Sequence, residues 1–182
     1  RMITTPFGLY DCDVPCDGSV AVIVSRKDLA ADMKQKPVYL EAVGTQVSER
    51  MSWDQGVLDH EPLVTGPAGH MWTRTDLGPT DVDMALLYDG FSFNCLSWIE
   101  ALGFCGKGEG GAFVEDGRLR VGGALPTNTD GGGLSACHPG MRGMFLMVEA
   151  VRQLRGEGGP RQVPDARIVC VNGTGGWFSS AA

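Results

Sequence analysis

Short apolar runs that end in glycine-rich polar turns constrain the fold of this chain more than any other feature. Residues 84–88 and 166–171 each have the length and composition of one buried strand, and each is followed by Asp or Asn and then Gly. Apolar residues three and four positions apart predict a helix over residues 93–102, and a longer helix is predicted over 139–154. This alternation predicts an α/β fold in which the strand ends bring their polar turns to one edge of a sheet.

Weaker signals predict further elements. Residues 17–24 begin with a turn and continue as a β-branched run, which predicts a strand buried on both faces. Ser25 is expected to cap a short helix that ends at about Met33, and a second strand is predicted over residues 38–43. Residues 48–80 are interpreted as an irregular excursion, and residues 115–117 as the turn of a hairpin.

Composition excludes several classes of protein. The 182 residues carry 15 basic and 22 acidic side chains, a net charge of −7 that argues against nucleic-acid binding. No apolar run approaches the ~20 residues of a membrane span, and no secretory signal is visible. The six cysteines are irregularly spaced, as expected of reduced thiols in a cytoplasmic protein. Cys12 and Cys16 lack a second ligand pair, so no metal site is expected.

The most informative stretch is residues 131–143, which places His138 between a glycine-rich loop and a predicted helix. The amino end of a helix favours an anion or a developing oxyanion and disfavours the imidazolium cation. His138 is therefore a candidate base or neutral hydrogen-bond donor. The alternative is an unreactive residue that precedes the helix.

Four motifs, in order along the chain, resemble motifs of the thiolase superfamily. They are the strand motif of residues 17–22, the Tyr88-Asp89-Gly90-Phe91 motif, the glycine-rich His138 motif with Asn128 upstream, and the terminal glycine loop of residues 172–176. The resemblance implies an α/β, thiolase-like fold, with mixed five-stranded sheets packed with helices and layered αβαβα in the complete protein. Residues 1–35 would end the amino-terminal half, and residues 36–182 would form the carboxyl-terminal half, apparently without its final strand.

Departures from the thiolase pattern bear on the reaction. Tyr88 stands where sterol-carrier-type thiolases have histidine, Cys137 replaces a glycine, and Cys170 lies one residue from the position of the acid/base cysteine. The Tyr-Asp-Gly-Phe form resembles the lipid-transfer-protein-like aldolases of steroid side-chain degradation. This implies a carbon–carbon lyase that cleaves a steroid-type tertiary β-hydroxyacyl-CoA to a ketone and a short acyl-CoA. The alternatives are a thiolase-type acyltransferase and a non-catalytic protein that binds acyl-CoA or sterol.

The resemblance also implies site residues and partners. Tyr88 and His138 would share the proton transfers, with the assignment of acid and base left open. Asn128, Gly175 and Gly176 would bind the substrate, with the two glycines lining the site of the thioester oxygen. No cofactor is expected, because coenzyme A enters as part of the substrate. The family forms homodimers through the thiolase interface, and the aldolases work with a small partner that carries an oligonucleotide-binding-type barrel and a zinc ribbon.

Overall fold

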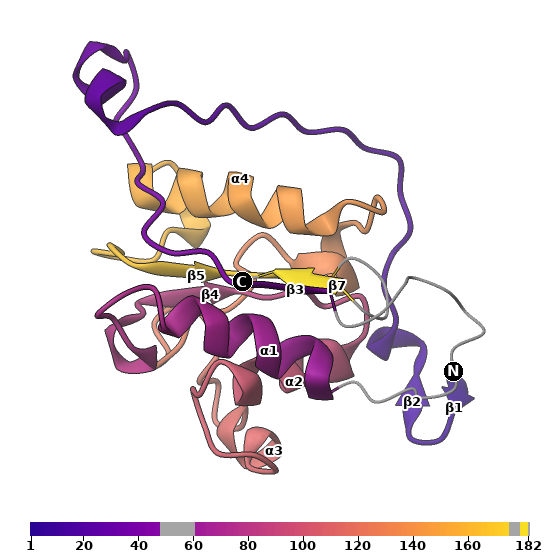
Figure 1. Ribbon diagram of the computed structural model, residues 1–182. Helices are drawn as coiled ribbons and strands as arrows, with labels where there is room; N and C mark the ends of the chain where they lie inside the picture. The colour runs from indigo at the N-terminus through magenta and orange to yellow at the C-terminus, as the bar shows by residue number, and fades with distance from the viewer. Residues whose placement is uncertain (48–60, 175–178, 182) are drawn as a thin grey trace.

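The computed structural model describes residues 1–47, 61–174 and 179–181 (Figure 1). The strands are β1 (Met2–Thr4), β2 (Phe7–Gly8), β3 (Thr45–Val47), β4 (Met84–Leu86), β5 (Val169–Val171), β6 (Gly173–Thr174) and β7 (Ser179–Ala181). The α-helices are α1 (Glu61–Trp72), α2 (Ser92–Ala101), α3 (Gly110–Phe113) and α4 (Arg142–Arg155). The 3₁₀-helices are η1 (Leu9–Asp11), η2 (Lys27–Asp32), η3 (Pro79–Asp81) and η5 (Gly159–Arg161), and η4 (Gly132–Ala136) is one turn of π-helix.

Two parallel strands, β4 and β5, form the centre of the described chain. Met84 pairs with Val169 and Leu86 with Val171. Helix α4 covers one face of this pair, and α1 and α2 lie on the opposite face (Figure 1). The strands at residues 84–88 and 166–171 are thus confirmed in shorter form, as is the helix predicted over 93–102, which is α2.

Alternate side chains of β4 enter two separate cores. Met84 and Leu86 pack with Leu146 of α4, whereas Ala85 and its neighbour Leu87 pack with Trp98 and other residues of α1 and α2. All six of these side chains have 0% exposure. Because successive strand residues point to opposite faces, an unbroken apolar run is what a strand covered on both sides requires.

A second small sheet has the order β3-β7-β6 and is antiparallel throughout. Strand β6 follows β5 after a single residue, so the chain passes directly from the parallel pair into this sheet. Strand β7 is the last element of the described residues, and the expected lack of a final strand stays a prediction. The division into residues 1–35 and 36–182 stays a prediction.

Helix α1 contradicts the interpretation of residues 48–80 as irregular over Glu61–Trp72. Residues 73–78 are turns and bends as expected, and residues 48–60 lie outside the described part. Gly66, Pro67 and Gly69 give this helix a low intrinsic propensity. Its buried face explains why it forms nevertheless, because Ala68 and Met71 join the core around Trp98. Packing outweighs propensity here.

Residues 17–43, which we call the arm, run across α4 as extended chain interrupted by η2, rather than forming the two predicted strands (Figure 1). The short helix predicted after Ser25 is present as η2, but its cap residue is Arg26 and not Ser25. Ile23 and Val24 are 95% and 77% exposed, and within the described part of the chain no strand lies beside them. Without a neighbour to accept its backbone hydrogen bonds, a β-branched run stays a single extended segment. The arm is tied to the end of α4, where Lys36 Nζ donates to the Leu154 carbonyl (2.8 Å).

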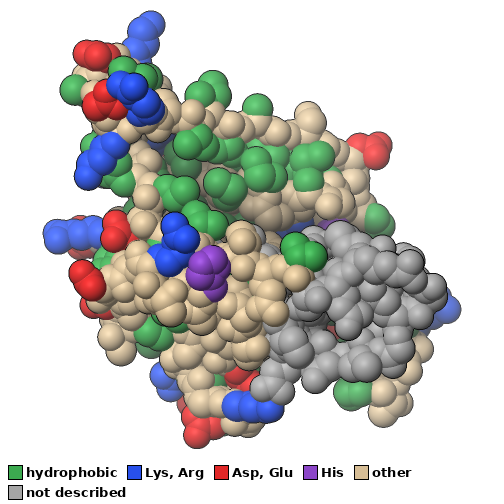
Figure 2. Space-filling model, in the orientation of Figure 1, with side chains coloured by type: hydrophobic (Ala, Val, Ile, Leu, Met, Phe, Trp, Pro, Cys, Tyr) green, Lys and Arg blue, Asp and Glu red, His purple; other side chains and the backbone are tan. Residues whose placement is uncertain are grey.

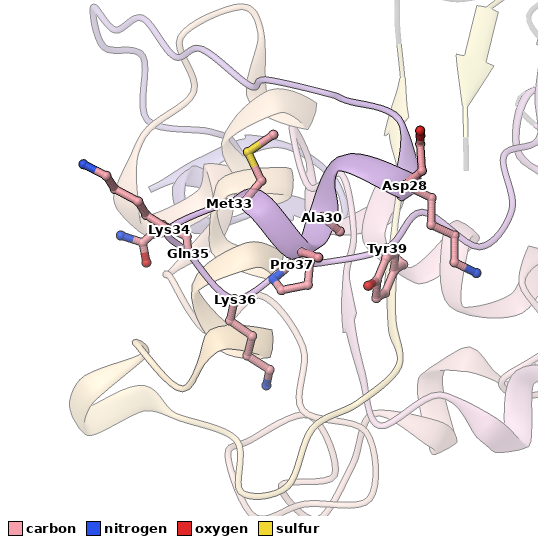
Figure 3. A pocket seen from close by; sticks show the side chains of 10 residues that line it. Asp28, Ala30, Met33, Lys34, Gln35, Lys36, Pro37 and Tyr39 are labelled. Atoms are coloured by element: carbon pink, nitrogen blue, oxygen red, sulfur yellow. The ribbon is translucent and has the colours of Figure 1, made fainter.

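Side chains of the arm add to an apolar surface that continues over α4 (Figure 2). An open hollow of about 500 Å³ lies beside η2, lined by Lys27, Lys34, Lys36 and Tyr39 among others (Figure 3). None of the predicted site residues lines it.

Two further sequence expectations are corrected. Residues 115–117 form a turn with positive φ at Asp116 and Gly117, but no strands flank it, so there is no hairpin. Helix α4 begins at Arg142, three residues later than predicted, because Gly140 adopts φ +60° and interrupts the helix.

Three findings on the described residues concern disulfides, membrane spans and metal sites. All six cysteines are unpaired. No helix among residues 1–47, 61–174 and 179–181 is long and apolar enough to cross a membrane. Over the same residues, no three His, Cys, Asp or Glu side chains are grouped to hold a metal ion.

Candidate active site

Two asparagine side chains hold the chain in place where it leaves β4. Asn128 Oδ1 accepts from the Leu87 amide (2.7 Å), and Asn128 Nδ2 donates to the Leu87 carbonyl (2.8 Å). Asn172 Oδ1 accepts from the next amide, that of Tyr88 (2.7 Å). Side-chain amides thus continue the hydrogen bonding of a strand beyond its end and fix the backbone of Tyr88. Both polar atoms of Asn128 are engaged with backbone, so its predicted contact with a substrate stays a prediction.

Tyr88 and His138, the two predicted catalytic residues, are brought together although 50 residues separate them. The Tyr88 hydroxyl lies 3.0 Å from His138 Nε2. The rings meet edge to face, with centroids 5.5 Å apart and an interplanar angle of 71°. This distance allows a proton to pass between the phenol and the imidazole.

Asp13 completes the group and was missed by the sequence analysis. Its Oδ2 lies 3.2 Å from Nδ1 of His138, and the side chains of His138 and Asp13 are 15% and 32% exposed. No motif in the sequence includes Asp13 or indicates this contact. Asp13 lies four residues before the Asp17-Gly18 motif. The three groups form a row of carboxylate, imidazole and phenol.

Residues 12–15 reach this row by docking between two loops. The Asp13 amide donates to the Gly90 carbonyl (3.2 Å), and the Val14 amide donates to the Gly133 carbonyl (2.9 Å). The His138 amide donates back to Val14 (2.7 Å), and Pro15 and His138 form a parallel bridge. His138 is therefore held in extended backbone, not at the first turn of α4.

The glycine-rich loop below His138 is held by two carboxylates. Asp89, which is 3% exposed, accepts from the Gly133 amide (2.7 Å) and more weakly from the Leu134 amide (3.4 Å). Asp130 accepts from the Gly132 amide (3.0 Å) and pairs with the buried Arg142 (2.6 Å). Burial raises the pKa of Asp89, and the amide hydrogen bonds oppose this only in part. Asp89 thus orders the loop that carries His138.

The surroundings of Tyr88 keep its hydroxyl protonated. Burial, followed by the negative charges of Asp13 and Asp89, raises the pKa of Tyr88 above the ordinary 10.0. Gly90 leaves room for the ring, because a Cβ there would lie 2.7 Å from Tyr88 Cζ. A neutral phenol next to a histidine can donate a proton to, or exchange one with, a reacting group.

Cys170, the nearest equivalent of a thiolase acid/base cysteine in the sequence, is not part of this group. It lies in β5, is 5% exposed, and packs in the core around Trp98. Burial raises its pKa to about 12, which disfavours the thiolate form that a nucleophile requires near neutral pH. Gly175 and Gly176, predicted to bind the thioester, lie outside the described residues.

The Gly132→Ala substitution is expected to destabilise the protein by more than Gly140→Ala. Both glycines have positive φ, +65° and +60°, so both substitutions carry left-handed strain of about 1–2 kcal/mol. A Cβ at Gly132 would also fall on the buried Asp89 carboxylate, whereas nothing lies within 4 Å of a Cβ at Gly140. We expect this overpacking to add about 1–2 kcal/mol.

Urea denaturation of the complete protein measures the difference between these two variants. Equal losses for the two variants would show that Asp89 moves aside freely, and would contradict its role in ordering the loop.

The chain matches the family described as thiolase C-terminal domain-like over residues 67–182. It is 41% identical over 160 residues to a 17-hydroxy-3-oxo-4-pregnene-20-carboxyl-CoA lyase of Mycobacterium tuberculosis, an alignment that covers 86% of this chain and 41% of that protein. It is 36% identical to an acetyl-CoA acetyltransferase of Methanothermobacter thermautotrophicus, with coverage of 100% and 48%.

Among solved structures, an Ltp2-ChsH2(DUF35) aldolase superposes with a TM-score of 0.79 at 30% identity, over 100% of this chain and 48% of that one. The chain thus spans less than half the length of each of these relatives. The thiolase-like fold expected from the sequence is confirmed by this superposition. On the family match, the chain belongs to the thiolase C-terminal domain-like family.

Proposed function

We propose that the complete protein is an acyl-CoA carbon–carbon lyase that cleaves a steroid-type tertiary β-hydroxyacyl-CoA by a retro-aldol reaction. The observation that carries this proposal is the 3.0 Å contact between the Tyr88 hydroxyl and His138 Nε2. A retro-aldol cleavage needs one group to accept the hydroxyl proton and one to return a proton to the enolate, and it needs no covalent nucleophile. The similarity to a steroid-CoA lyase over 86% of the chain supports the same reaction class.

The reaction balances with the groups present and the substrate alone. The β-hydroxyl proton passes to the Tyr88–His138 pair, the Cα–Cβ bond breaks, and the alkoxide carbon becomes a ketone. The electron pair of that bond remains on the thioester as an enolate, which takes a proton back from the pair. No cofactor is consumed, and the products are a ketone and a shortened acyl-CoA.

Several features of the complete protein are part of the same proposal. Residues 1–35 end an amino-terminal half, and residues 36–182 form most of the carboxyl-terminal half. The protein is a cytoplasmic homodimer, with Asn128, Gly175 and Gly176 close to the substrate thioester. A small partner with a zinc ribbon and an oligonucleotide-binding-type fold completes the enzyme, a suggestion supported by the two-component name of the similar Ltp2-ChsH2(DUF35) aldolase.

An acyltransferase of the thiolase type is the second candidate. The 36% identity to an acetyl-CoA acetyltransferase over the whole chain favours it. The burial of Cys170 argues against it, because Claisen chemistry requires a second proton-carrying group next to the nucleophilic thiolate. A third candidate, a non-catalytic binding protein, predicts affinity for acyl-CoA without turnover.

Product analysis of the complete protein, with its partner, tests these candidates. A steroid-type tertiary β-hydroxyacyl-CoA is supplied without free CoA, and mass spectrometry follows the acyl-CoA products. We expect a ketone and a shortened acyl-CoA, and no reaction with the matched substrate that lacks the β-hydroxyl. CoA-dependent splitting of a β-ketoacyl-CoA, with the β-hydroxyacyl-CoA left intact, would contradict the lyase and show that the protein is an acyltransferase.

A further inference from the structure

We propose that Asp13 is a positioning residue that sets the tautomer of His138 and thereby makes Tyr88 the group that contacts the substrate. This inference rests on the proposed function for its consequence in catalysis, but the hydrogen-bond arrangement itself does not. It also answers which of Tyr88 and His138 exchanges protons with the substrate.

The order of the three groups determines the direction of their hydrogen bonds. Asp13 Oδ2 lies 3.2 Å from Nδ1, and a carboxylate charge at that distance favours the tautomer of His138 that carries its proton on Nδ1. In a neutral imidazole, Nε2 is then left with its lone pair. At 3.0 Å, Nε2 accepts the hydrogen bond that the Tyr88 hydroxyl donates. Without Asp13 both tautomers of His138 become available.

The backbone that carries the Asp13 side chain is held in place on both sides. The Asp13 amide bonds to Gly90, two residues after Tyr88, and the Val14 amide bonds to Gly133, in the loop that carries His138. One short segment therefore ties together the two loops that supply the other members of the row. Because its backbone is fixed in this way, Asp13 presents its carboxylate to the imidazole from a defined position.

Other ionisable groups near the row do not compete for Nδ1. Asp89 directs its oxygens to the Gly133 and Leu134 amides. Burial, followed by the neighbouring Cys137 thiol, raises the pKa of Cys16, which follows Pro15 in the docked segment. Among the described residues, the contacts of the His138 ring are the hydroxyl of Tyr88 at Nε2 and the carboxylate of Asp13 at Nδ1.

In catalysis this arrangement moves one proton in each direction. The Tyr88 oxygen takes the β-hydroxyl proton of the substrate while its own proton passes to Nε2, which forms an imidazolium beside Asp13. After the Cα–Cβ bond breaks, Tyr88 protonates the enolate and recovers its proton from Nε2. Asp13 stabilises the imidazolium between these steps and does not itself change protonation.

The test uses the complete protein with selectively ¹⁵N-labelled histidine, and compares wild type with Asp13→Asn and Asp13→Ala. The ¹⁵N chemical shifts of His138, identified by their loss in His138→Ala, report which ring nitrogen is protonated. We expect Nδ1–H in the wild type and a shift toward Nε2–H in Asp13→Ala. The matched control is Asp17→Asn, the same change at an exposed position four residues away, with no effect on tautomer or turnover.

Kinetics with the β-hydroxyacyl-CoA complete the test. We expect kcat to fall about 10²-fold in both Asp13 variants with KM little changed, because the substrate does not contact Asp13. A wild-type tautomer with Nε2–H overturns the inference whatever the activity, and so does wild-type turnover in Asp13→Ala. If the wild type cleaves no β-hydroxyacyl-CoA, the proposed function fails, and the chemical shifts still decide the hydrogen-bond arrangement.

Discussion

The Tyr88→Phe variant of the complete protein is expected to cleave the β-hydroxyacyl-CoA about 10²–10⁴-fold more slowly than the wild type. The change removes the hydroxyl that lies 3.0 Å from His138 Nε2 and keeps the ring that fills the space beside Gly90. The loss should therefore appear in kcat with little change in KM, because a proton-transfer group acts in the transition state rather than in substrate binding. Steady-state kinetics, with the shortened acyl-CoA as product, measure both constants.

Tyr10→Phe is the matched control for this change. Tyr10 is 89% exposed and lies in η1, so the same loss of a hydroxyl should leave the rate unchanged. Thermal unfolding of both variants tests whether the fold is kept. Full turnover in Tyr88→Phe would remove Tyr88 from the mechanism, whatever the effect of changes at His138.

The Glu149→Ala variant is expected to lose about 1–3 kcal/mol of stability, the cost of removing a buried carboxylate that accepts charged and neutral hydrogen bonds, while its partner Arg161 is 37% exposed and can turn to water. The Glu149 side chain is 2% exposed and binds the Arg161 guanidinium through two hydrogen bonds of 2.9 Å. It also accepts from Thr129 (2.8 Å) and from Gln153 (2.9 Å), which is 1% exposed. Removing the carboxylate takes the acceptor from Arg161 and Thr129, while Gln153 Nε2 keeps its bonds to the Arg161 carbonyl (3.0 Å) and to Thr129 (3.2 Å). It also frees Thr129, next to Asp130.

The stability lost in Glu149→Ala should depend on pH. Burial alone raises the pKa of Glu149, but hydrogen bonds from Arg161, Gln153 and Thr129 outweigh it and hold the pKa below the ordinary 4.5. The carboxylate therefore contributes its full stabilisation above pH 4.5, and this is lost as the pH falls through the lower pKa of the folded protein.

Urea denaturation at a series of pH values compares Glu149→Ala with the control Glu157→Ala, at an exposed position of the loop after α4. The control should lie within about 0.5 kcal/mol of the wild type at every pH. A loss in Glu149→Ala that is equally small at pH 7 would mean that Arg161 and Gln153 find other partners.

Predictions from local pattern succeeded where both faces of an element are covered within the chain. The run of residues 84–88 and the apolar spacing of residues 93–102 correspond to β4 and α2, which pack on each other around Trp98. The same reasoning failed for residues 17–24, because a strand depends on a neighbour that pattern alone does not supply. It also failed for α1, whose Gly66, Pro67 and Gly69 conceal a helix stabilised by its packing.

The same distinction between local pattern and distant contacts applies to the candidate site. The resemblance of the motifs around Tyr88 and His138 to thiolase-superfamily motifs identified the two residues, and the position of His138 in a glycine-rich loop also pointed to it. Asn128 was recognised by its position, but not its pairing with Leu87, and Asn172, which holds the Tyr88 amide, was seen only as part of a glycine loop. Such pairings join residues 41 and 84 positions apart, and no local pattern specifies them.

The sequence by itself determined the parts of this protein that depend on neighbours along the chain: the apolar strand, the amphipathic helix, the glycine-rich turns, and the two residues placed at their ends. Only the tertiary structure decided that Asp13 joins Tyr88 and His138. That contact requires residues 12–15 to dock between two loops. The residues they contact there, Gly90 and Gly133, are 43 positions apart in the sequence. The hydrogen bonds that hold the segment there use backbone atoms, which are the same for every residue and leave no mark in the sequence.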